Sequence, residues 1–336
     1  MKILFSSYVF DPSVGGIESV SKILVEEFAA AGNDVHVITQ SEGEPISDAN
    51  YQLTRCPSIS EVFRLLRRCD LFFQNNMSLR SLIPAVLRRK PTLIVHQTWF
   101  QNVHGGVGWQ NRLKHVMLRF ATNVAISKAV ADRIGACQFV IGNPYNDDVF
   151  QSMPNVLRDK AIVFVGRLVS DKGVDLLLYA LELLKRDGLA PGLTIVGGGP
   201  EETNLRKLSA ELGLDRQVTF AGQKTGAALA QILNRHQILA VPSRWAEPFG
   251  VVALEGIACG CVVVGSEEGG LKEAIGPCGV TFENGNVAEL SAQLNRLLTD
   301  DQLRENLKQG AVEQLAKSKS DAIASAYLRI MRKMVA

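Results

Sequence analysis

The sequence has no apolar run long enough to span a membrane and no Cys-x-x-Cys pair. Its six cysteines are scattered at positions 56, 69, 137, 259, 261 and 278, which indicates neither a zinc site nor a disulfide framework. The first residues are too polar for a signal peptide, because Ser6, Ser7 and Asp11 interrupt a short apolar run. These absences predict a cytoplasmic protein in a reducing compartment, without a membrane-spanning segment.

Three further absences narrow the possible function classes. The sequence has no Asp-x-Asp, so it offers no obvious ligands for a metal ion bridged to a diphosphate. It has no Gly-x-Ser-x-Gly, which argues against a serine hydrolase. Its net charge is only +2, which predicts no nucleic-acid partner. What remains is a chain of 336 residues, 46% of them hydrophobic, which is enough for two domains of ordinary size.

Short apolar strands alternate with helical stretches in two series. This alternation is typical of doubly wound α/β domains, in which helices cover both faces of a parallel sheet. A polar run over 147–159 separates the series, so we expect one domain over 1–148 and a second over 149–320. The strands are expected at 2–10, 34–40, 51–55, 71–75, 91–97, 123–127 and 138–142, and then at 161–168, 193–199, 218–221, 238–242 and 261–266.

Two features of the first series lie at the carboxyl ends of predicted strands. Gly15-Gly16 follows the first strand, where ligands bind in open α/β sheets and where glycine lets the backbone approach a phosphate. An ordinary tight turn is the alternative. His96 ends an apolar strand and is expected to project from the same edge, where it could position or deprotonate a hydroxyl group. A structural histidine bonded to the backbone is the alternative there.

In the second series, Arg167 ends the first strand and Lys172 lies in the turn that follows. Both could reach a diphosphate, Arg167 as a fork of donors and Lys172 as a point charge. A surface ion pair with Asp171 is the alternative. The next strand ends in a glycine-rich turn at Gly199, but Glu202 stands where the GxGxxG fingerprint requires glycine. The failed fingerprint argues against a nicotinamide-dependent oxidoreductase.

The stretch Ser243–Glu273 places Glu247 and Glu255 eight residues apart around a Pro-Phe-Gly turn. A helix is predicted after this turn, so the amides of residues 249–251 would be free donors at its N-terminus, where anions bind. Glu255 could accept hydrogen bonds from the vicinal hydroxyls of a ribose, and Glu247 from those of a sugar. A phosphate-binding site between two carboxylates suits a sugar nucleotide. Spacing alone is equally compatible with two solvated glutamates.

Positive charge is concentrated between Arg55 and Arg119, where the sequence has eleven Lys or Arg residues and only two acids, Glu61 and Asp70. A predicted helix within this segment, 61–69, is apolar on one face and carries arginines on the other. Such a segment could contact an anionic membrane surface or a lipid diphosphate. Solvated helix faces are the alternative.

Together these residues resemble the retaining, sugar-nucleotide-dependent enzymes of glycosyltransferase family 4. The resemblance covers almost the whole chain, and four pieces carry it in order: VGRLVSDKG, VGGGPEE, the Glu247–Glu255 pair with its PFG turn, and GGLKE. It implies a GT-B architecture, with two doubly wound Rossmann-like domains facing across a cleft and the nucleotide mainly on the second. It also implies that a terminal helix over 321–336 crosses back to the first domain.

Carried over by position, the resemblance gives each candidate a role. Arg167 and Lys172 would neutralise the diphosphate, Glu247 would contact the donor sugar, Glu255 would hold the ribose, and His96 would touch the sugar or the incoming hydroxyl. The donor-binding set is completed by Gly15, Gly16, Gly199, Phe249, Gly250 and Val251.

The reaction that the resemblance implies is the transfer of a hexose to a hydroxyl of a saccharide or lipid-linked acceptor, in polysaccharide or glycoconjugate biosynthesis at the inner face of the membrane. UDP-glucose or a similar UDP-hexose is the expected donor because it is the commoner choice in the family. No cofactor and no metal ion are expected. The alternatives are a non-catalytic sugar-nucleotide-binding protein and a sugar-nucleotide epimerase. A glycoside phosphorylase would require a longer chain and a lysine placed for pyridoxal phosphate.

Overall fold

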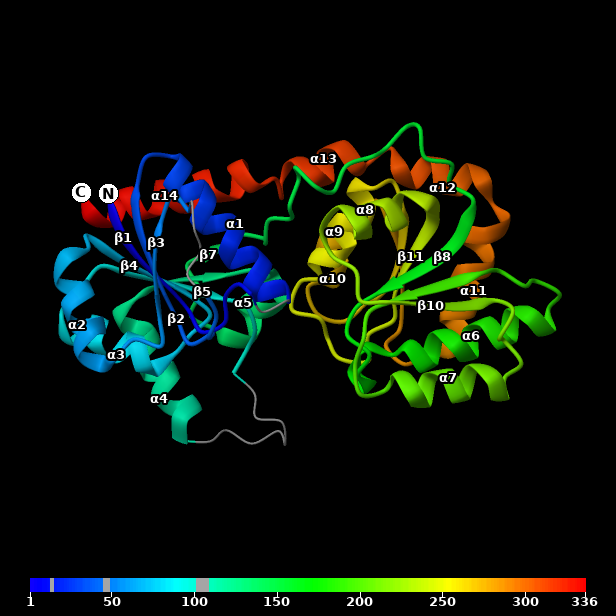
Figure 1. Ribbon diagram of the computed structural model, residues 1–336, viewed down its shortest axis with the longest axis horizontal. Helices are drawn as coiled ribbons and strands as arrows, with labels where there is room; N and C mark the ends of the chain where they lie inside the picture. The colour runs from blue at the N-terminus through cyan, green and yellow to red at the C-terminus, as the bar shows by residue number, and fades with distance from the viewer. Residues whose placement is uncertain (13–14, 45–48, 101–108) are drawn as a thin grey trace. The chain divides into compact units, whose positions relative to one another are not determined.

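The computed structural model describes residues 1–12, 15–44, 49–100 and 109–336, and the chain divides into two compact units (Figure 1). The first unit comprises Met1–Pro144 together with Lys319–Ala336, and the second comprises Tyr145–Ser318. The sequence predicts these two domain boundaries after residues 148 and 320. Each unit is built on its own sheet, and the end of the chain belongs to the first unit.

The sheet of the first unit has seven parallel strands in the order β3-β2-β1-β4-β5-β6-β7. The order along the chain reverses between β1 and β4, and ligands of open α/β sheets bind beyond the carboxyl ends of the strands at such a switch point. The strands are β1 (Lys2–Ser7), β2 (Asp34–Thr39), β3 (Gln52–Arg55), β4 (Leu71–Asn75), β5 (Thr92–His96), β6 (Thr122–Ala125) and β7 (Phe139–Val140).

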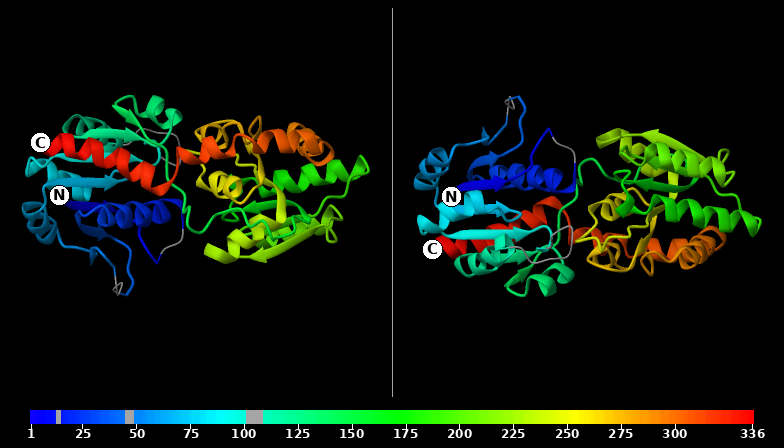
Figure 2. Two further views of the ribbon diagram at one scale, coloured as in Figure 1. Left: turned by 90° about the horizontal axis from the view of Figure 1, so that it is seen from above. Right: turned by 90° about the horizontal axis from the view of Figure 1, so that it is seen from below.

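Helices cover both faces of this sheet. The pair α1 (Gly16–Ala30) and α14 (Ser320–Val335) pack side by side, as Figure 2 shows, and α2 (Ile59–Arg68) packs against α3 (Leu79–Leu87). The helix α2 begins at a capping box, in which Ser58 and Glu61 satisfy each other's backbone amides. The other helical elements of this unit are α4 (Trp109–Met117), the 3-10 helix η1 (Leu118–Phe120) and α5 (Lys128–Ile134).

An aromatic cluster holds α14 in the core of the first unit. Tyr327 of α14 is fully buried, and its ring lies edge-on to Phe73 of β4 and Phe28 of α1, with centroids 5.5 and 6.5 Å apart. Phe73 in turn stacks on Phe5 of β1 at 4.9 Å. Burial of these large rings stabilises the unit and explains why the last helix packs with the first 144 residues.

The second unit has a six-stranded parallel sheet in the order β10-β9-β8-β11-β12-β13, with a switch point between β8 and β11. Its strands are β8 (Lys160–Val165), β9 (Leu193–Val196), β10 (Val218–Gly222), β11 (His236–Val241), β12 (Val262–Ser266) and β13 (Gly279–Phe282). Its helices are η2 (a 3-10 turn, Ser170–Lys172), α6 (Val174–Arg186), α7 (Glu202–Glu211), α8 (Gly226–Arg235), α9 (Val251–Ala258), α10 (Leu271–Ile275), α11 (Val287–Thr299), α12 (Asp301–Lys308) and α13 (Ala311–Ala316).

Two details of the second unit correct the sequence-based prediction. The strand β13 was not expected, because it has only four residues and three of them are half-buried. The pattern of residues 300–317 predicts a single helix, but the structure has two helices there, α12 and α13, which are separated at Gly310. A Cβ at Gly310 would lie 2.4 Å from the Pro277 side chain, so the chain approaches its neighbour too closely there for a larger residue. Glycine, which is unfavourable inside a helix, stands at the break.

No helix in the described parts of the chain is long and apolar enough to cross a membrane. All six cysteines are free thiols, and only Cys56 is exposed. The same described residues contain no group of three or more His, Cys, Asp or Glu side chains that could hold a metal ion.

Candidate functional site

The sequence-predicted residues of the second unit gather where β8 and β11 end. Lys172 lies in η2, directly after the loop that follows β8, and Glu247 lies in the loop between β11 and α9. The two strands are neighbours at the switch point of this sheet, so their carboxyl-terminal loops face the position where a ligand is expected.

Gly173 brings η2 against the end of β11. Its backbone is left-handed, with φ of 66°, and a Cβ at this position would lie only 2.0 Å from the carbonyl oxygen of Pro242. The carbonyl of Asp171 also accepts a hydrogen bond from the amide of Arg244 at 2.8 Å. Only glycine permits this close approach, which places Lys172 within reach of the loop that carries Glu247.

Glu247 is nearly buried, with 9% of its surface exposed, and two donors bind one of its carboxylate oxygens. Lys172 Nζ forms an ion pair with Oε1, and Ser243 Oγ donates to the same atom at 2.6 Å. The Oε2 atom accepts no hydrogen bond from the residues that the structure describes. Lys172 therefore pairs with Glu247, not with Asp171, and one oxygen of Glu247 is left to accept a hydrogen bond from a ligand hydroxyl.

The backbone of Glu247 is fixed by the GGLKE segment. Gly270 N donates to the Glu247 carbonyl at 2.6 Å, and a Cβ at Gly269 would lie 2.2 Å from that same oxygen. Asn284, beyond β13, donates to the Ser243 carbonyl at 3.1 Å and accepts from the Glu268 amide at 3.0 Å. The loop that presents Glu247 is thus tied at both ends, which preorganises the carboxylate.

Arg167 is exposed, and no described acid pairs with it. The turn that carries Gly199 packs directly against its neighbour: a Cβ at Gly199 would lie 2.4 Å from the Leu168 carbonyl, and Leu168 N donates to the carbonyl of Gly198 at 3.0 Å. The glycine turn after β9 therefore supports the loop after β8, and Arg167 stands beside it as an uncompensated positive charge.

The N-terminus of α9 has the open amides that the sequence predicted. The helix starts at Val251, after the left-handed Gly250, and no side chain caps it. Within the described chain, no acceptor is bonded to the amides of Phe249, Gly250 or Val251. The ring of Phe249 is 6% exposed, so its side chain anchors the loop in the core while its amide is left for an anion.

Glu255 lies one turn into α9, partly exposed, and no described side chain donates to its carboxylate. Burial raises the pKa of Glu255 to about 7, because no cation compensates the cost of desolvating its charge. A carboxylate held in such a position is stabilised when a ligand supplies hydroxyl donors. The geometry is compatible with the ribose contact predicted from sequence.

The first unit carries the remaining predicted residues. Gly16 begins α1 and Gly15 precedes it in extended backbone, with its carbonyl accepting from Ser19 N at 3.1 Å. A Cβ at Gly15 would lie 2.5 Å from a carboxylate oxygen of Glu18, whereas Gly16 has open space around it. These glycines stand at the carboxyl end of β1, as expected, and their contact with a donor stays a prediction.

His96 ends β5, but the expectation that its ring projects from the sheet edge needs correction. The residue is fully buried, and the Phe100 ring packs edge-on to it with centroids 5.6 Å apart. Its Nε2 lies 3.0 Å from Asn123 Oδ1. The Asn123 amide nitrogen donates to the Leu118 and Ala121 carbonyls, so Oδ1 must be the acceptor and Nε2 carries the proton.

This arrangement leaves His96 Nδ1 as an acceptor without a partner among the described residues. Burial lowers the pKa of His96 to about 4, so the imidazole is neutral at neutral pH. A neutral ring with an unsatisfied acceptor can take a hydrogen bond from a hydroxyl group once that nitrogen is reached. Its catalytic role stays a prediction.

Sequence reasoning missed Ser243, Asn284 and Asn123, which position Glu247 and His96. Ser243 opens the stretch that contains Glu247, but no residue pattern marks it as a donor. Asn123 and Asn284 are distant in sequence from the groups that they support. Only the folded structure identifies them.

Residues 146–314, about half of the chain, match the family described as "Glycosyl transferases group 1". The chain belongs to this family, and every predicted residue from Arg167 to Glu255 lies within the match. The fold is that of the GT-B glycosyltransferases, and the resemblance to family 4 is confirmed.

Curated relatives agree with this assignment. The chain is 36% identical over 165 residues to a D-inositol 3-phosphate glycosyltransferase of Corynebacterium efficiens, a match that covers 47% of this chain and 39% of the relative. It is 33% identical over 178 residues to an uncharacterized glycosyltransferase of Methanocaldococcus jannaschii, covering 52% and 45% of the two chains. The chain matches less than half of the length of these relatives.

Solved structures show the same fold over nearly all of the chain. A crystal structure of Anabaena HepE in complex with UDP and glucose has a TM-score of 0.81 at 19% identity and covers 99% of this chain and 100% of its own. Sucrose-phosphate synthase from Thermosynechococcus elongatus has a TM-score of 0.82 at 21% identity, covering 99% and 98%.

Proposed function

We propose that this protein is a retaining, metal-independent hexosyltransferase. It transfers a hexose from a nucleotide diphosphate sugar, preferably UDP-glucose or a similar UDP-hexose, to a hydroxyl of a saccharide or lipid-linked acceptor. The observation that carries the proposal is the cluster of Lys172 and Glu247 beside the uncapped start of α9. Membership of the group 1 family supports transfer chemistry. The complex of the similarly folded HepE with UDP and glucose supports a UDP donor.

Three features of the second unit suit a donor diphosphate. Arg167 supplies a guanidinium without a described acidic partner, and Lys172 supplies an ammonium held in place by Glu247. The α9 amides add oriented dipoles at a helix N-terminus. Together these groups stabilise the negative charge that develops on the leaving diphosphate, the task that a metal ion performs in other transferases.

The two glutamates would hold the two ends of the donor. Glu255 would accept hydrogen bonds from the ribose hydroxyls, and the free Oε2 of Glu247 would accept one from the hexose. The anomeric configuration would be retained because the acceptor hydroxyl attacks the same face of the hexose that the diphosphate leaves. The bond from the anomeric carbon to the phosphate oxygen breaks, and the bond to the acceptor oxygen forms. The acceptor proton passes to the leaving phosphate. His96 Nδ1 would accept a hydrogen bond from the sugar or the incoming hydroxyl.

A basic face formed by α2 and α3 would bring the first unit to an anionic membrane. Helix α3, which packs against α2, exposes the apolar side chains of Ile83 and Leu87, which are 38% and 69% exposed. Exposed arginines lie on α2, among them Arg67 and Arg68 in its last turn. Exposed apolar side chains and arginines on neighbouring helices suit an interface of anionic lipids, where a lipid-linked acceptor would be found.

The experiment that tests the function is calorimetric titration with UDP, GDP, ADP and their glucose conjugates, with a chelator present. We expect one nucleotide to bind without metal and its glucose conjugate to be slowly hydrolysed. If the glucose conjugate binds but no glucose is released with any acceptor tried, the result would indicate a non-catalytic sugar-nucleotide-binding protein. Absence of binding by every nucleotide would contradict the proposal.

A further inference from the structure

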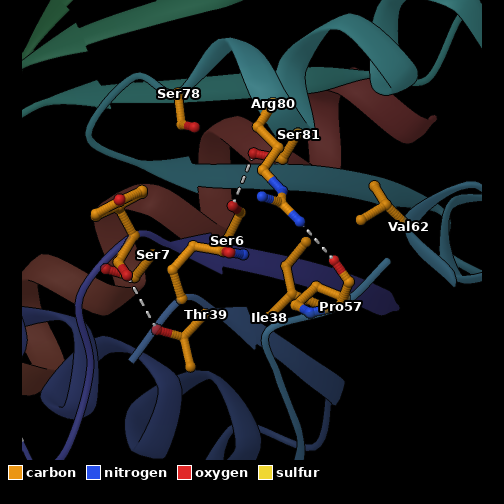
Figure 3. Close-up of a pocket in the computed structure, with 11 residues that line it drawn as sticks. Ser6, Ser7, Ile38, Thr39, Pro57, Val62, Ser78, Arg80 and Ser81 are labelled. Atoms are coloured by element: carbon orange, nitrogen blue, oxygen red, sulfur yellow. Dashed lines mark hydrogen bonds between the residues drawn. The ribbon is translucent and has the colours of Figure 1, made fainter. Parts of the chain in front are cut away.

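A pocket in the first unit lies beyond the carboxyl ends of β1 and β2, beside the start of α3 (Figure 3). Ser6 at the end of β1 and Ser78 and Ser81 at the start of α3 contribute hydroxyl groups to its wall. Arg80 is the only charged side chain among the described residues that line it. The pocket therefore stands at the switch point between β1 and β4, and no described carboxylate faces it.

Arg80 is held at the pocket with most of its donors unused. One guanidinium nitrogen, Nη2, donates to the Pro57 carbonyl at 3.2 Å, and no acidic side chain of the described chain pairs with it. Figure 3 shows this bond reaching from α3 across the pocket to Pro57. Because a guanidinium carries five N–H donors, the others are left for an anion.

The hydroxyl groups differ in how far they are committed. Ser7 donates to the Val9 carbonyl at 2.7 Å and Thr39 to the Tyr8 carbonyl at 3.2 Å, so their protons are occupied. Ser78 precedes α3, but its side chain caps no amide and binds no described residue. Ser78 and the first amides of α3 thus offer donors beside Arg80.

Ser6 and Ser81 are positioned by a buried amide. Gln74 Nε2 donates to Ser81 Oγ at 2.7 Å and to the Ser78 carbonyl at 2.9 Å, which fixes the orientation of the amide. Ser81 Oγ lies 3.0 Å from Ser6 Oγ. When Ser81 donates to Ser6, the Ser6 proton is available to a ligand. The start of α3 is thereby fastened to the end of β1, which fixes this wall of the pocket.

We propose that this pocket binds a phosphate group carried by the acceptor. The inference rests on the proposed transferase function and names the chemical class of acceptor. A fork of guanidinium donors, free hydroxyls and helix amides, with no described carboxylate facing them, is complementary to a tetrahedral oxyanion rather than to a neutral sugar. The phosphate belongs either to a soluble sugar phosphate or to a lipid-linked phosphate, because both present the same headgroup.

The test is calorimetric titration of the full chain, with saturating UDP to occupy the donor site. The soluble probes are glucose 6-phosphate and inorganic phosphate, with glucose as the unphosphorylated control. A short-chain polyprenyl phosphate in detergent micelles forms the lipid arm. Arg80→Gln removes the charge, and Ser78→Ala removes the free hydroxyl. Arg329→Gln removes an exposed charge from α14, in the same unit but outside the pocket, and serves as the matched control.

We expect a phosphorylated probe to bind and glucose not to. Arg80→Gln should raise its Kd by about tenfold or more, Ser78→Ala should raise it less, and Arg329→Gln should leave it unchanged. Binding in the soluble arm alone assigns a sugar phosphate, and binding in the lipid arm alone assigns a lipid-linked phosphate. An unchanged Kd in Arg80→Gln, or no binding of any phosphorylated probe, overturns the proposal. If the proposed transferase function is wrong, this would be detected separately, because UDP would then fail to bind the second unit.

Discussion

The two units place different side chains at the same edge of the same kind of sheet. In the second unit, the loops after β8 and β11 bring a lysine and a glutamate into an ion pair and leave an arginine exposed beside them. In the first unit, the corresponding edge presents serine hydroxyls, Arg80 and a buried neutral histidine. The doubly wound fold therefore supplies the position, and the loops determine which ligand chemistry each unit can serve.

The difference extends to how each unit treats charge. Glu247 is compensated by Lys172, whereas Glu255 has no described cation and its pKa rises to about 7. Burial in the first unit has the opposite effect on a base, since it lowers the pKa of His96 to about 4. An uncompensated carboxylate destabilises the free protein. Perturbed pKa values of this kind are common among binding residues. The ionised Glu255 carboxylate thus carries a desolvation cost that hydrogen-bond donors would reduce.

Removing positive charge from the second unit should have the largest effect. We expect Arg167→Ala or Lys172→Gln to lower turnover by about 10²–10³-fold, because each removes a group that stabilises the leaving diphosphate. Release of UDP from the nucleotide sugar measures turnover. Lys207→Ala, which breaks the exposed ion pair with Glu211 on α7, is the control and should leave the rate unchanged. A wild-type rate in Arg167→Ala would exclude that residue from the diphosphate site.

Loss of the Glu255 carboxylate should weaken binding rather than catalysis alone. We expect Glu255→Gln to raise the Kd of the nucleotide by about 10- to 100-fold, the value of hydrogen bonds to a charged acceptor. In the wild type, affinity should rise as the pH rises through about 7, because the ionised carboxylate is the better acceptor of ribose hydroxyls.

Calorimetry with the 2′-deoxynucleotide separates the titration of Glu255 from the titration of the nucleotide phosphates. Because the deoxynucleotide keeps only the 3′-hydroxyl, Glu255→Gln should cost it less affinity than it costs the ribonucleotide, and its pH profile should differ less between the two proteins. If instead the pH profile of the ribonucleotide were the same in both proteins, the ribose contact would be ruled out.

The basic face of α2 and α3 allows a test of the first unit that does not depend on catalysis. Binding to phosphatidylglycerol vesicles should weaken several-fold when salt rises from about 0.1 M to about 1 M, because the Debye length falls from about 10 Å to about 3 Å. The variant Arg67→Gln/Arg68→Gln should bind more weakly than Arg216→Gln/Lys224→Gln. The latter removes the same charge from exposed positions of the second unit. Equal binding by the two variants would leave these arginines as a solvated surface.

The sequence predicted the layered fold because buried parallel strands appear as short apolar runs bounded by glycine and polar turns. It predicted the candidate residues of the second unit because Lys172 and Glu247 lie in recognisable turns, and Glu255 lies in the helix that follows the Pro-Phe-Gly turn. It did not predict the pairing of Lys172 with Glu247, residues 75 positions apart. That contact depends on how closely Gly173 approaches Pro242 and Gly269 approaches Glu247, which are properties of tertiary packing.

The first unit was less predictable for the same physical reason. The pocket is assembled from the ends of two strands, the loop at Pro57 and the first turn of α3, and no local motif joins these pieces. The burial of His96 depends on Phe100 and Asn123, which reach it from outside its own strand. Side chains supplied by distant segments leave no periodic signal in a single sequence, so the strand was predicted and the environment of its last residue was not.

The smallest expected effect is on stability, and it follows from the sign of the Glu255 shift. Its pKa is raised from 4.5 in an unperturbed carboxyl to about 7, so the folded state binds this proton more tightly than the unfolded state does. The resulting destabilisation is absent below pH 4.5, grows as the pH rises and is complete above about 7. Glu255→Gln should therefore melt at a higher temperature than wild type at about pH 8, and the difference should shrink as the pH falls and vanish below 4.5. A Glu255→Gln protein no more stable than wild type at the higher pH would mean that its charge is compensated, and that the two units do not differ in this respect.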